Sequence, residues 1–470
     1  MLGMATLGLA GPATAQAVPY EGVSMHSMWD QVSPTDMAHE LDLAAAAHSN
    51  VVRVDVGWSG MEMDGPGQMS AGYLAKLDQL VSAAAARGLK VLPVVFSTPC
   101  WASSAPDSIK QGCAGQWWTR GVNLYPPSDP GTYARFMAWM VGRYGSQLAA
   151  VELWNEPDAD GQAFWVSPNP AGDYAALVRA AYPAIKAVNR SVPVLAGSLS
   201  GGDARFLREL YANGMRGYYD GLAVHPYNGS LAPGQPSASG YERWTMLTGL
   251  NALRQARSEV GDTAPMWATE FGWSTAGSPQ LVTAALQATY LSAAIPWLRG
   301  MPDIAGSVVF ELRAMGDSAD NDGFALTNAD FSPRPAYAAV QAAMATRPPG
   351  DPGTPSGGGS GGSPGGSGKG STGGSTSGPA GTTTASPTSP SGPATTSPSS
   401  PTTPPPSGST LSSGTALAAR QWVAPAHAAV RRGARRQGHH PRRPRRARRQ
   451  GHHPRRPRRA HAARHGQRRR

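Results

Sequence analysis

Short runs of β-branched residues alternate with Ala-rich amphipathic stretches from residue 20 to residue 346, and this alternation is the strongest constraint on the fold. It is typical of βα units built around a parallel sheet. We predict strands at 22–26, 51–56, 90–96, 150–153, 194–198, 221–225, 266–270 and 306–311. A helix is predicted after each strand, at 34–48, 71–87, 131–144, 173–188, 204–213, 243–260, 279–298 and 335–344. Eight such units predict a (β/α)8 TIM barrel, with a doubly wound open α/β sheet as the alternative.

Several helix ends carry local signals. Ser33 before Pro34 is typical of an N-cap followed by the first helical residue. Gly88 and Gly145 follow predicted helices, as glycines with a left-handed backbone do. These signals fix one predicted helix start and two predicted helix ends.

The composition changes sharply after residue 347. Many of the 57 Gly and 43 Pro lie between Pro348 and Ala416, where Leu411 is the only large apolar side chain. Such a stretch cannot bury a core, so 348–416 is expected to be a flexible linker. The 19 arginines from Arg420 onward exceed the net charge of +11, so the rest of the chain carries −8. An acidic remainder excludes nucleic-acid binding through the predicted barrel.

Residues 417–470 form an Arg/His/Pro-rich tail with a tandem repeat, at 434–446 and again at 447–459. Runs of arginine repel one another, so the tail is expected to be disordered. It would suit contacts with an anionic polymer, and its His pairs would suit weak metal binding. The alternative is that this segment is an out-of-frame translation of GC-rich DNA.

Residues 1–17 form an apolar run that ends in Ala-Thr-Ala-Gln-Ala, similar to the core and cleavage site of a secretory signal peptide. The basic segment that normally precedes such a core is missing, so we expect a true start further upstream, or else a merely apolar N-terminus. No other stretch reaches about 18 consecutive apolar residues, so no transmembrane span is predicted. Two cysteines, Cys100 and Cys113, are too few for a disulfide scaffold or a four-thiolate zinc site.

Two glutamates close predicted strands on the side of the barrel where reacting groups gather. Glu156 ends the fourth strand within Trp-Asn-Glu-Pro, and Glu270 ends the seventh within Thr-Glu-Phe-Gly-Trp. Active sites of such barrels lie at the C-terminal ends of the strands, and strands four and seven face each other across the mouth. Two converging carboxyl groups perform glycoside hydrolysis, with retention when they stand about 5 to 5.5 Å apart. The alternative is that both are surface-loop carboxylates.

These two motifs, on the fourth and seventh of eight strands, resemble the clan of retaining β-glycoside hydrolases with (β/α)8 barrels. Within that clan the chain is most similar to cellulase-like (family 5-like) actinobacterial enzymes and to family 39, including exopolysaccharide endoglycosidases. The resemblance covers residues 20–346. It implies that Glu156 is the acid/base, that Glu270 is the nucleophile and that Asn155 binds the sugar 2-hydroxyl.

Further candidates surround these carboxylates. Arg53 lies in an apolar strand, where a charge must be paired. The resemblance implies that Arg53 holds Glu270 ionised; the alternative is a structural salt bridge with Asp55 or another acid. After strand six, the resemblance places Tyr227 against the nucleophile and His225 beside the sugar. For His225, and for His26 at the end of strand one, the alternative is a satisfied core histidine.

Aromatic rings stack on sugar faces, and several tryptophans follow predicted strand ends. We expect sugar platforms, with some core residues, among Trp58, Trp101, Trp117, Trp118, Trp165 and Trp273. The clan commonly has a Trp at the end of strand eight, whereas this chain has Phe310-Glu311, so the reacting sugar stays open. A bridge between Cys100 and Cys113, in the loop after strand three, would stiffen one wall of the cleft and would fit export; unpaired thiols are the alternative.

Together these features predict a secreted, monomeric, retaining β-glycosidase that cleaves inside a polysaccharide and uses no metal or organic cofactor. One alternative is an exo-acting enzyme similar to the β-xylosidases of family 39. Another is a carbohydrate-binding barrel that has lost catalysis and is anchored to the cell wall by its basic tail. The predicted parts are a signal peptide (1–17), a catalytic barrel (18–347), a linker (348–416) and a tail (417–470).

Overall fold

The computed structural model describes residues 19–240, 243–277 and 281–350. In that part of the chain, parallel strands pair in sequence order and close into a barrel, because β1 pairs with both β2 and β8. The strands are β1 (Tyr20–Met25), β2 (Val51–Gly57), β3 (Lys90–Phe96), β4 (Val151–Leu153), β5 (Val194–Ser200), β6 (Gly221–His225), β7 (Met266–Phe271) and β8 (Ile304–Val309). The predicted (β/α)8 barrel is confirmed, and the open sheet is excluded.

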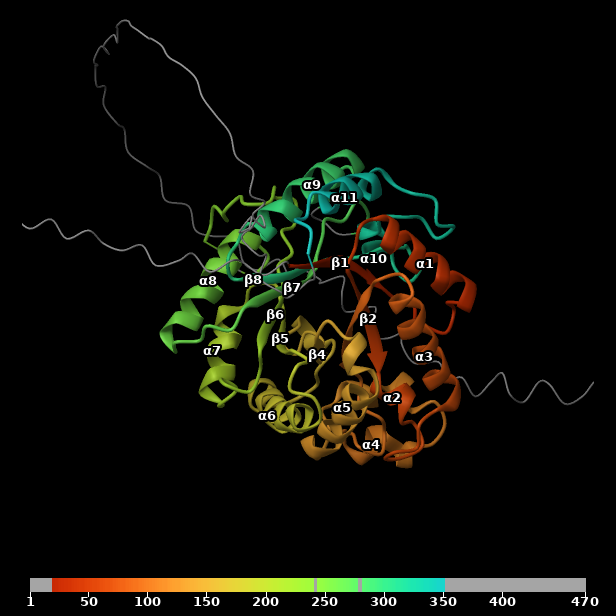
Figure 1. Cartoon of the computed structure of the whole chain (residues 1–470). Helices are drawn as coiled ribbons and strands as arrows, with labels where there is room; N and C mark the ends of the chain where they lie inside the picture. Colours follow the sequence, from red (N-terminus) through yellow and green to blue (C-terminus); the bar gives the residue numbers. More distant parts are fainter. Residues whose placement is uncertain (1–18, 241–242, 278–280, 351–470) are drawn as a thin grey trace, which may run out of the picture. The chain divides into compact units, whose positions relative to one another are not determined.

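Helices surround these strands (Figure 1). Those that connect or follow them are α1 (Pro34–Ala46), α3 (Ala71–Ala85), α5 (Pro130–Tyr144), α6 (Pro170–Val188), α7 (Ala204–Ala212), α8 (Met246–Glu259), α9 (Ala284–Arg299) and α11 (Pro335–Ala345). Shorter helices lie in the loops: α2 (Trp58–Met61), α4 (Asp107–Lys110) and α10 (Ala319–Phe324). The 3-10 turns are η1 (Gln111–Cys113), η2 (Trp117–Arg120), η3 (Val122–Leu124), η4 (Gly145–Gln147) and η5 (Asp160–Gln162).

Most predicted ends lie within a few residues of the observed ones, with exceptions at Gly145 and at the end of strand eight. Ser33 caps α1 in a capping box with Asp36, and Gly88 has a left-handed φ of +71°. The predicted left-handed conformation at Gly145 is wrong, because its φ is −47° and the chain continues into η4. A Cβ at Gly145 would lie 2.6 Å from Nδ2 of Asn189, so a larger residue there would require the Asn189 side chain to move.

The end of strand eight also differs from the prediction. The strand is predicted to run to residue 311, but β8 ends at Val309. Beyond it the amide of Leu312 donates to the carbonyl of Ser24 across 2.9 Å, so the chain turns over the end of β1. This turn places Glu311 above the barrel mouth instead of within the sheet.

The two-residue period of the strands divides apolar from charged residues. In β2, Val52, Val54 and Val56 pack outward in the core between strands and helices, whereas Val51, Arg53 and Asp55 lie on the alternate positions that face inward. At the N-terminal end the interior is apolar, and Tyr20 stacks on Trp267 with 5.2 Å between ring centroids. The charged groups therefore collect at the C-terminal end of the barrel.

None of the helices within the described residues is long and apolar enough to cross a membrane. The predicted signal peptide, the tail, and the linker beyond residue 350 lie outside the described residues.

Candidate active site

Glu270 reaches the barrel interior through an irregularity in β7. Simple alternation would send the neighbouring side chains of Thr269 and Glu270 to opposite faces. The pairing between β7 and β8 shifts register between Ala268 and Phe271, and such a shift redirects side chains. Both side chains then bond inside the barrel, Thr269 to Glu152 and Glu270 to Arg53.

Glu156 is directed by an unusual backbone after β4. Trp154 and Glu156 both have a positive φ, +69° and +41°, which costs about 1–3 kcal/mol for each residue. The surroundings hold this conformation, because the Trp154 indole donates to the carbonyl of Phe164 and the amide of Glu156 donates to the carbonyl of Ser198. Strain held in this way at a strand end is typical of functional sites.

Arg53 links the two strands that carry these glutamates. Its guanidinium donates from Nε to Glu152 Oε2 across 2.6 Å, from Nη1 to Glu270 Oε1 across 2.6 Å and from Nη2 to Asn155 Oδ1 across 2.9 Å. The side chain is 1% exposed. Burial lowers the pKa of Arg53, but Glu152 and Glu270 outweigh this effect and raise it, so Arg53 stays cationic. Arg53 therefore contacts Glu270, as the resemblance implied, and its structural partner is Glu152 instead of Asp55.

Tyr227 lies against the second oxygen of Glu270. Its hydroxyl donates to Glu270 Oε2 across 2.7 Å. Burial, and then the charge of Glu270, raise the pKa of Tyr227 well above 10, so the phenol stays a neutral donor. Each oxygen of Glu270 thus accepts one hydrogen bond, Oε1 from Arg53 and Oε2 from Tyr227.

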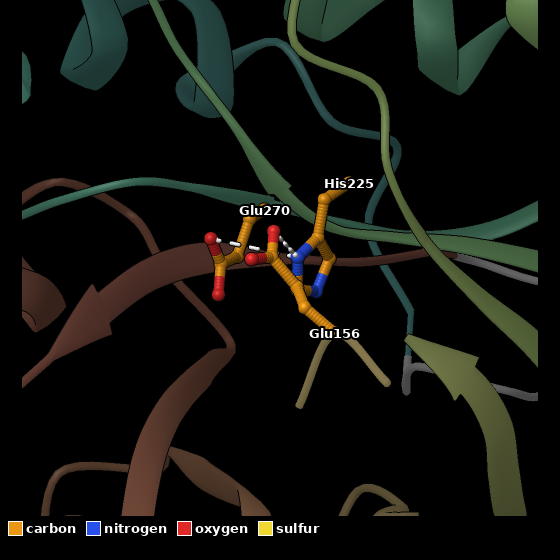
Figure 2. Close-up of side chains that lie close together, drawn as sticks. All are labelled: Glu156, His225 and Glu270. Atoms are coloured by element: carbon orange, nitrogen blue, oxygen red, sulfur yellow. Dashed lines mark hydrogen bonds and ion pairs between the residues drawn. The ribbon is translucent and has the colours of Figure 1, made fainter. Parts of the chain in front are cut away.

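His225 lies beside the two glutamates, and its Nδ1 interacts with one oxygen of each (Figure 2). Nδ1 is 3.0 Å from Glu156 Oε1 and 3.7 Å from Glu270 Oε2, and Nε2 is 3.6 Å from Glu152 Oε1. Burial lowers the pKa of His225, but the surrounding carboxylates, Glu270 first, outweigh burial and raise it to about 10. His225 is therefore an imidazolium, fully buried, that donates to Glu156.

The carboxyl group of Glu156 is in a different environment from that of Glu270. Burial raises the pKa of Glu156 and outweighs the hydrogen bond from His225, which lowers it. Among the described residues, Oε2 of Glu156 has no hydrogen-bond partner. One oxygen of Glu156, one of Glu270 and a nitrogen of His225 all lie within 4.8 Å of one another. The site thus holds two carboxyl groups in different surroundings at close range.

Glu156, His225 and Glu270 are near enough to one another to hold a metal ion. A histidine must be neutral to ligate a metal, whereas the neighbouring acidic groups, Glu270 first, raise the pKa of His225 and favour its cationic form. The donor set therefore suits proton transfer better than metal binding.

His26 belongs to a neighbouring cluster at the ends of β1, β2 and β8. Its Nδ1 lies 2.5 Å from Asp55 Oδ2, and its Nε2 lies 2.7 Å from Glu311 Oε2. Burial lowers the pKa of His26, but Asp55 and Glu311 raise it well above its ordinary value. Burial also raises the pKa of Glu311, to about 7, against the opposing effect of His26. The sequence analysis did not place Asp55 or Glu311 in this site. The available signal was that each is an acidic residue within or at the end of an apolar predicted strand.

The expected sugar platforms divide into buried and half-exposed rings. Trp58 is fully buried and donates to Glu62, and Trp273 is 1% exposed and donates to the carbonyl of Leu231, so both expectations are wrong. Trp117 and Trp165 are also buried. The half-exposed rings are those of Trp101 and Trp118. The position of a tryptophan after a strand end therefore does not predict whether its ring points into the cleft or packs beneath the loop.

The loop after β3 is crosslinked. Cys100 and Cys113 form a disulfide with an S–S distance of 2.02 Å. Cys100 packs with Trp117 and Val122 in a small apolar cluster of this loop. The bridge closes a short loop beside the half-exposed rings.

Solved structures with the same fold are glycoside hydrolases. A family 39 glycoside hydrolase from the gut symbiont Bacteroides cellulosilyticus WH2 is 23% identical, with a TM-score of 0.55, over 70% of this chain and 64% of that chain. An exo-β-1,4-mannosidase from Opitutaceae bacterium strain TAV5 is 19% identical, with a TM-score of 0.51, over 73% of this chain and 62% of that chain. A GH5_18 enzyme from Streptomyces cattleya, in complex with GlcNAc, is 19% identical, with a TM-score of 0.52, over 71% of this chain and 82% of that chain.

At these identities the likeness shows a shared fold, and the chain spans less than two thirds of the first two proteins. No curated protein sequence matches the chain significantly. A family model does match: the cellulase model of glycosyl hydrolase family 5 covers residues 12–298, more than half of the chain. With this match and two glutamates converging at the barrel mouth, the chain belongs to the cellulase family, glycosyl hydrolase family 5.

Proposed function

We propose that this protein is a secreted glycosidase that cleaves a polysaccharide internally, by double displacement with retention. Glu156 is the acid/base and Glu270 the nucleophile. The observation that carries the proposal is the pair of carboxyl groups, which approach within 4.8 Å. This separation fits direct attack by one carboxylate and leaves little room for the intervening water that inversion requires.

In the first step, Glu270 attacks the anomeric carbon while Glu156 gives its proton to the leaving glycosidic oxygen. Oε1 of Glu156 already accepts from His225, so Oε2 is the oxygen that carries and delivers the proton. The C–O bond to the leaving group breaks as the ester bond to Glu270 forms. The amide oxygen of Asn155 is taken by Arg53, so its Nδ2 is the atom that can donate to a sugar hydroxyl.

In the second step, Glu156 acts as the base. Ester formation removes the negative charge of Glu270, and Glu156 has lost its proton to the leaving group. Its carboxylate takes a proton from water, which attacks the anomeric carbon and releases Glu270. Arg53 and Tyr227 then stabilise the departing carboxylate through the same two hydrogen bonds.

Export and internal cleavage have separate support. The Cys100–Cys113 disulfide suits an oxidising compartment, in agreement with the signal-like apolar run at residues 1–17. Internal cleavage is supported by the resemblance of the strand-end motifs to exopolysaccharide endoglycosidases. Release of single sugars from a chain end is the alternative that the experiment below distinguishes.

The test incubates the purified full chain with β-glucans, xylans, mannans and bacterial exopolysaccharides, and separates the products by size. Glu156→Ala provides the blank. Glu21→Gln provides a control, because Glu21 is a buried acid at the start of β1 that pairs with Arg299. We expect oligosaccharides from the wild type and Glu21→Gln but not from Glu156→Ala.

The products decide between the alternatives. Release of monosaccharides alone would replace internal cleavage by exo action. Binding of a polysaccharide without any release that depends on Glu156 would contradict catalysis and favour a carbohydrate-binding barrel.

A further inference from the structure

We infer that Glu152 is a positioning residue whose fixed negative charge keeps the Glu156–His225 pair doubly protonated. The inference rests on the proposed function, since a doubly protonated pair is the form that protonates the leaving group. Glu152 lies in β4, four residues before Glu156, and does not reach the reacting atoms itself. It is 0% exposed and therefore acts through its neighbours.

The contacts of Glu152 are complete on both oxygens. Oε2 accepts from Arg53 Nε across 2.6 Å. Oε1 accepts from Ser198 Oγ across 2.7 Å and from Thr269 Oγ1 across 2.8 Å. Nε2 of His225 lies 3.6 Å from the same Oε1. Four strands thus hold one buried carboxylate directly below the imidazole that donates to the acid/base.

A charge count shows why the site needs this carboxylate. Arg53 and His225 supply two positive charges, and Glu270 supplies one negative charge. With Glu156 protonated, Glu152 supplies the second negative charge and the buried group of five is neutral. Without Glu152 the group would carry an excess positive charge away from water, which is costly. Loss of a proton from Glu156 or His225 would remove this excess charge at the lowest free-energy cost.

The protonation equilibria agree with the geometry. Burial raises the pKa of Glu152, but Arg53 and then His225 lower it to about 2, so Glu152 is charged at any working pH. Burial lowers the pKa of His225, but the charge of Glu270 and then the interaction with Glu152 raise it to about 10. Because Glu156 and His225 share a hydrogen bond, their protons leave in steps that belong to the pair.

Other groups face this cluster and stay unchanged in the test below. They are the phenols of Tyr133, Tyr174 and Tyr227, the carboxyl groups of Asp55 and Asp158, and the guanidinium of Arg243. A shift that appears only when the charge of Glu152 is removed is therefore assigned to Glu152.

The variant Glu152→Gln removes the charge and keeps the shape. The amide oxygen can accept from Arg53, and the Ser198 hydroxyl can donate to the carbonyl of Trp154, 2.9 Å away. In a plot of kcat/KM against pH, the alkaline limb should move to lower pH by about one unit or more, because the Glu156–His225 pair loses its first proton at a lower pH. Glu152→Asp keeps the charge and should keep the wild-type limb even if its activity falls.

Glu21→Gln is the matched control, since it also removes a buried strand carboxylate that pairs with arginine. It should lower the melting temperature without moving the alkaline limb. An unchanged limb in Glu152→Gln, with folding intact, would overturn the inference and leave Glu152 a structural residue.

A second measurement uses the wild-type protein and needs no turnover. Histidine labelled with ¹⁵N, with the His225 signal assigned by its loss in His225→Gln, should report an imidazolium at pH 8. A neutral His225 at pH 8 would overturn the inference even if Glu152→Gln fails to fold. If no glycoside is hydrolysed but His225 is cationic, the proposed function fails while the charge assignment holds.

Discussion

Nη1 of Arg53 lies 2.6 Å from Oε1 of Glu270, and both side chains are buried at the mouth of the barrel. A guanidinium can serve three acceptors in one plane, and here it serves Glu270, Glu152 and Asn155. Arg53 therefore joins the proposed nucleophile to the acid beneath it and to the residue beside the proposed acid/base.

Arg53→Ala should lose both activity and stability, because it leaves two buried carboxylates without their partner. Breaking a buried pair costs about 3–5 kcal/mol. Arg143→Ala is the control, since Arg143 pairs with Asp78 at the surface and its loss should destabilise the fold far less. Urea unfolding of the full chain measures both. Equal costs for the two variants would contradict the role of Arg53.

Glu270→Ala and Glu156→Ala should respond to azide with opposite stereochemistry on an activated β-glycoside. In Glu270→Ala, azide attacks from the vacated face and gives an α-glycosyl azide. In Glu156→Ala, the ester on Glu270 still forms and azide gives a β-glycosyl azide. NMR of the two products checks the assignment; the reverse pattern would exchange the two roles, and full activity without azide would remove either residue from catalysis.

Asp158 should make the fold less stable as the pH rises. Burial raises its pKa from 3.8 to about 8, against the opposing charge of Arg243. The folded state therefore binds a proton more tightly than the unfolded state, and its advantage is lost between about pH 4 and pH 8. Asp158→Asn cannot ionise, so its stability relative to wild type should grow across that range. A difference that stays constant from pH 4 to pH 8, measured by urea unfolding, would contradict this.

Substitutions of Trp101 and Trp58 should have different effects, the first mainly on substrate binding and the second mainly on the stability of the fold. The two rings pack edge to face with 5.9 Å between centroids, but Trp101 is half-exposed and Trp58 is fully buried. Trp58→Ala should destabilise the fold by about 3–5 kcal/mol. Trp101→Ala should cost less stability and raise KM for a polysaccharide, because the ring can stack on a sugar. An unchanged KM in Trp101→Ala would remove that ring from the substrate site.

Much of the fold was predictable because its signals are local. Each β-branched run is short and is followed by an amphipathic stretch, so the strand and helix order follows from periodicity alone. The conformation of Gly145 was predicted wrongly, because a glycine after a helix suggests a left-handed residue, whereas the chain here continues into η4. The end of β8 depends on the contact between Leu312 and Ser24.

The site was predictable where a residue ends a strand. Glu156 and Glu270 lie at strand ends, and the structure brings both to His225. The inward direction of Glu270 depends on a register shift that the sequence does not specify. Glu152 was missed although it is a charge in an apolar strand, and the reasoning applied to Arg53 would have found it. Trp58 and Trp273 were misplaced because the packing beneath loops decides their burial.

The most direct test of the central claim follows the anomeric configuration of the first product. The full chain is mixed with a β-glycoside substrate found by the polysaccharide screen, and proton NMR spectra are taken before mutarotation. Double displacement through Glu270 predicts that the β-anomer appears first and the α-anomer only later. Initial appearance of the α-anomer would show inversion and would contradict the assignment of Glu270 as the nucleophile.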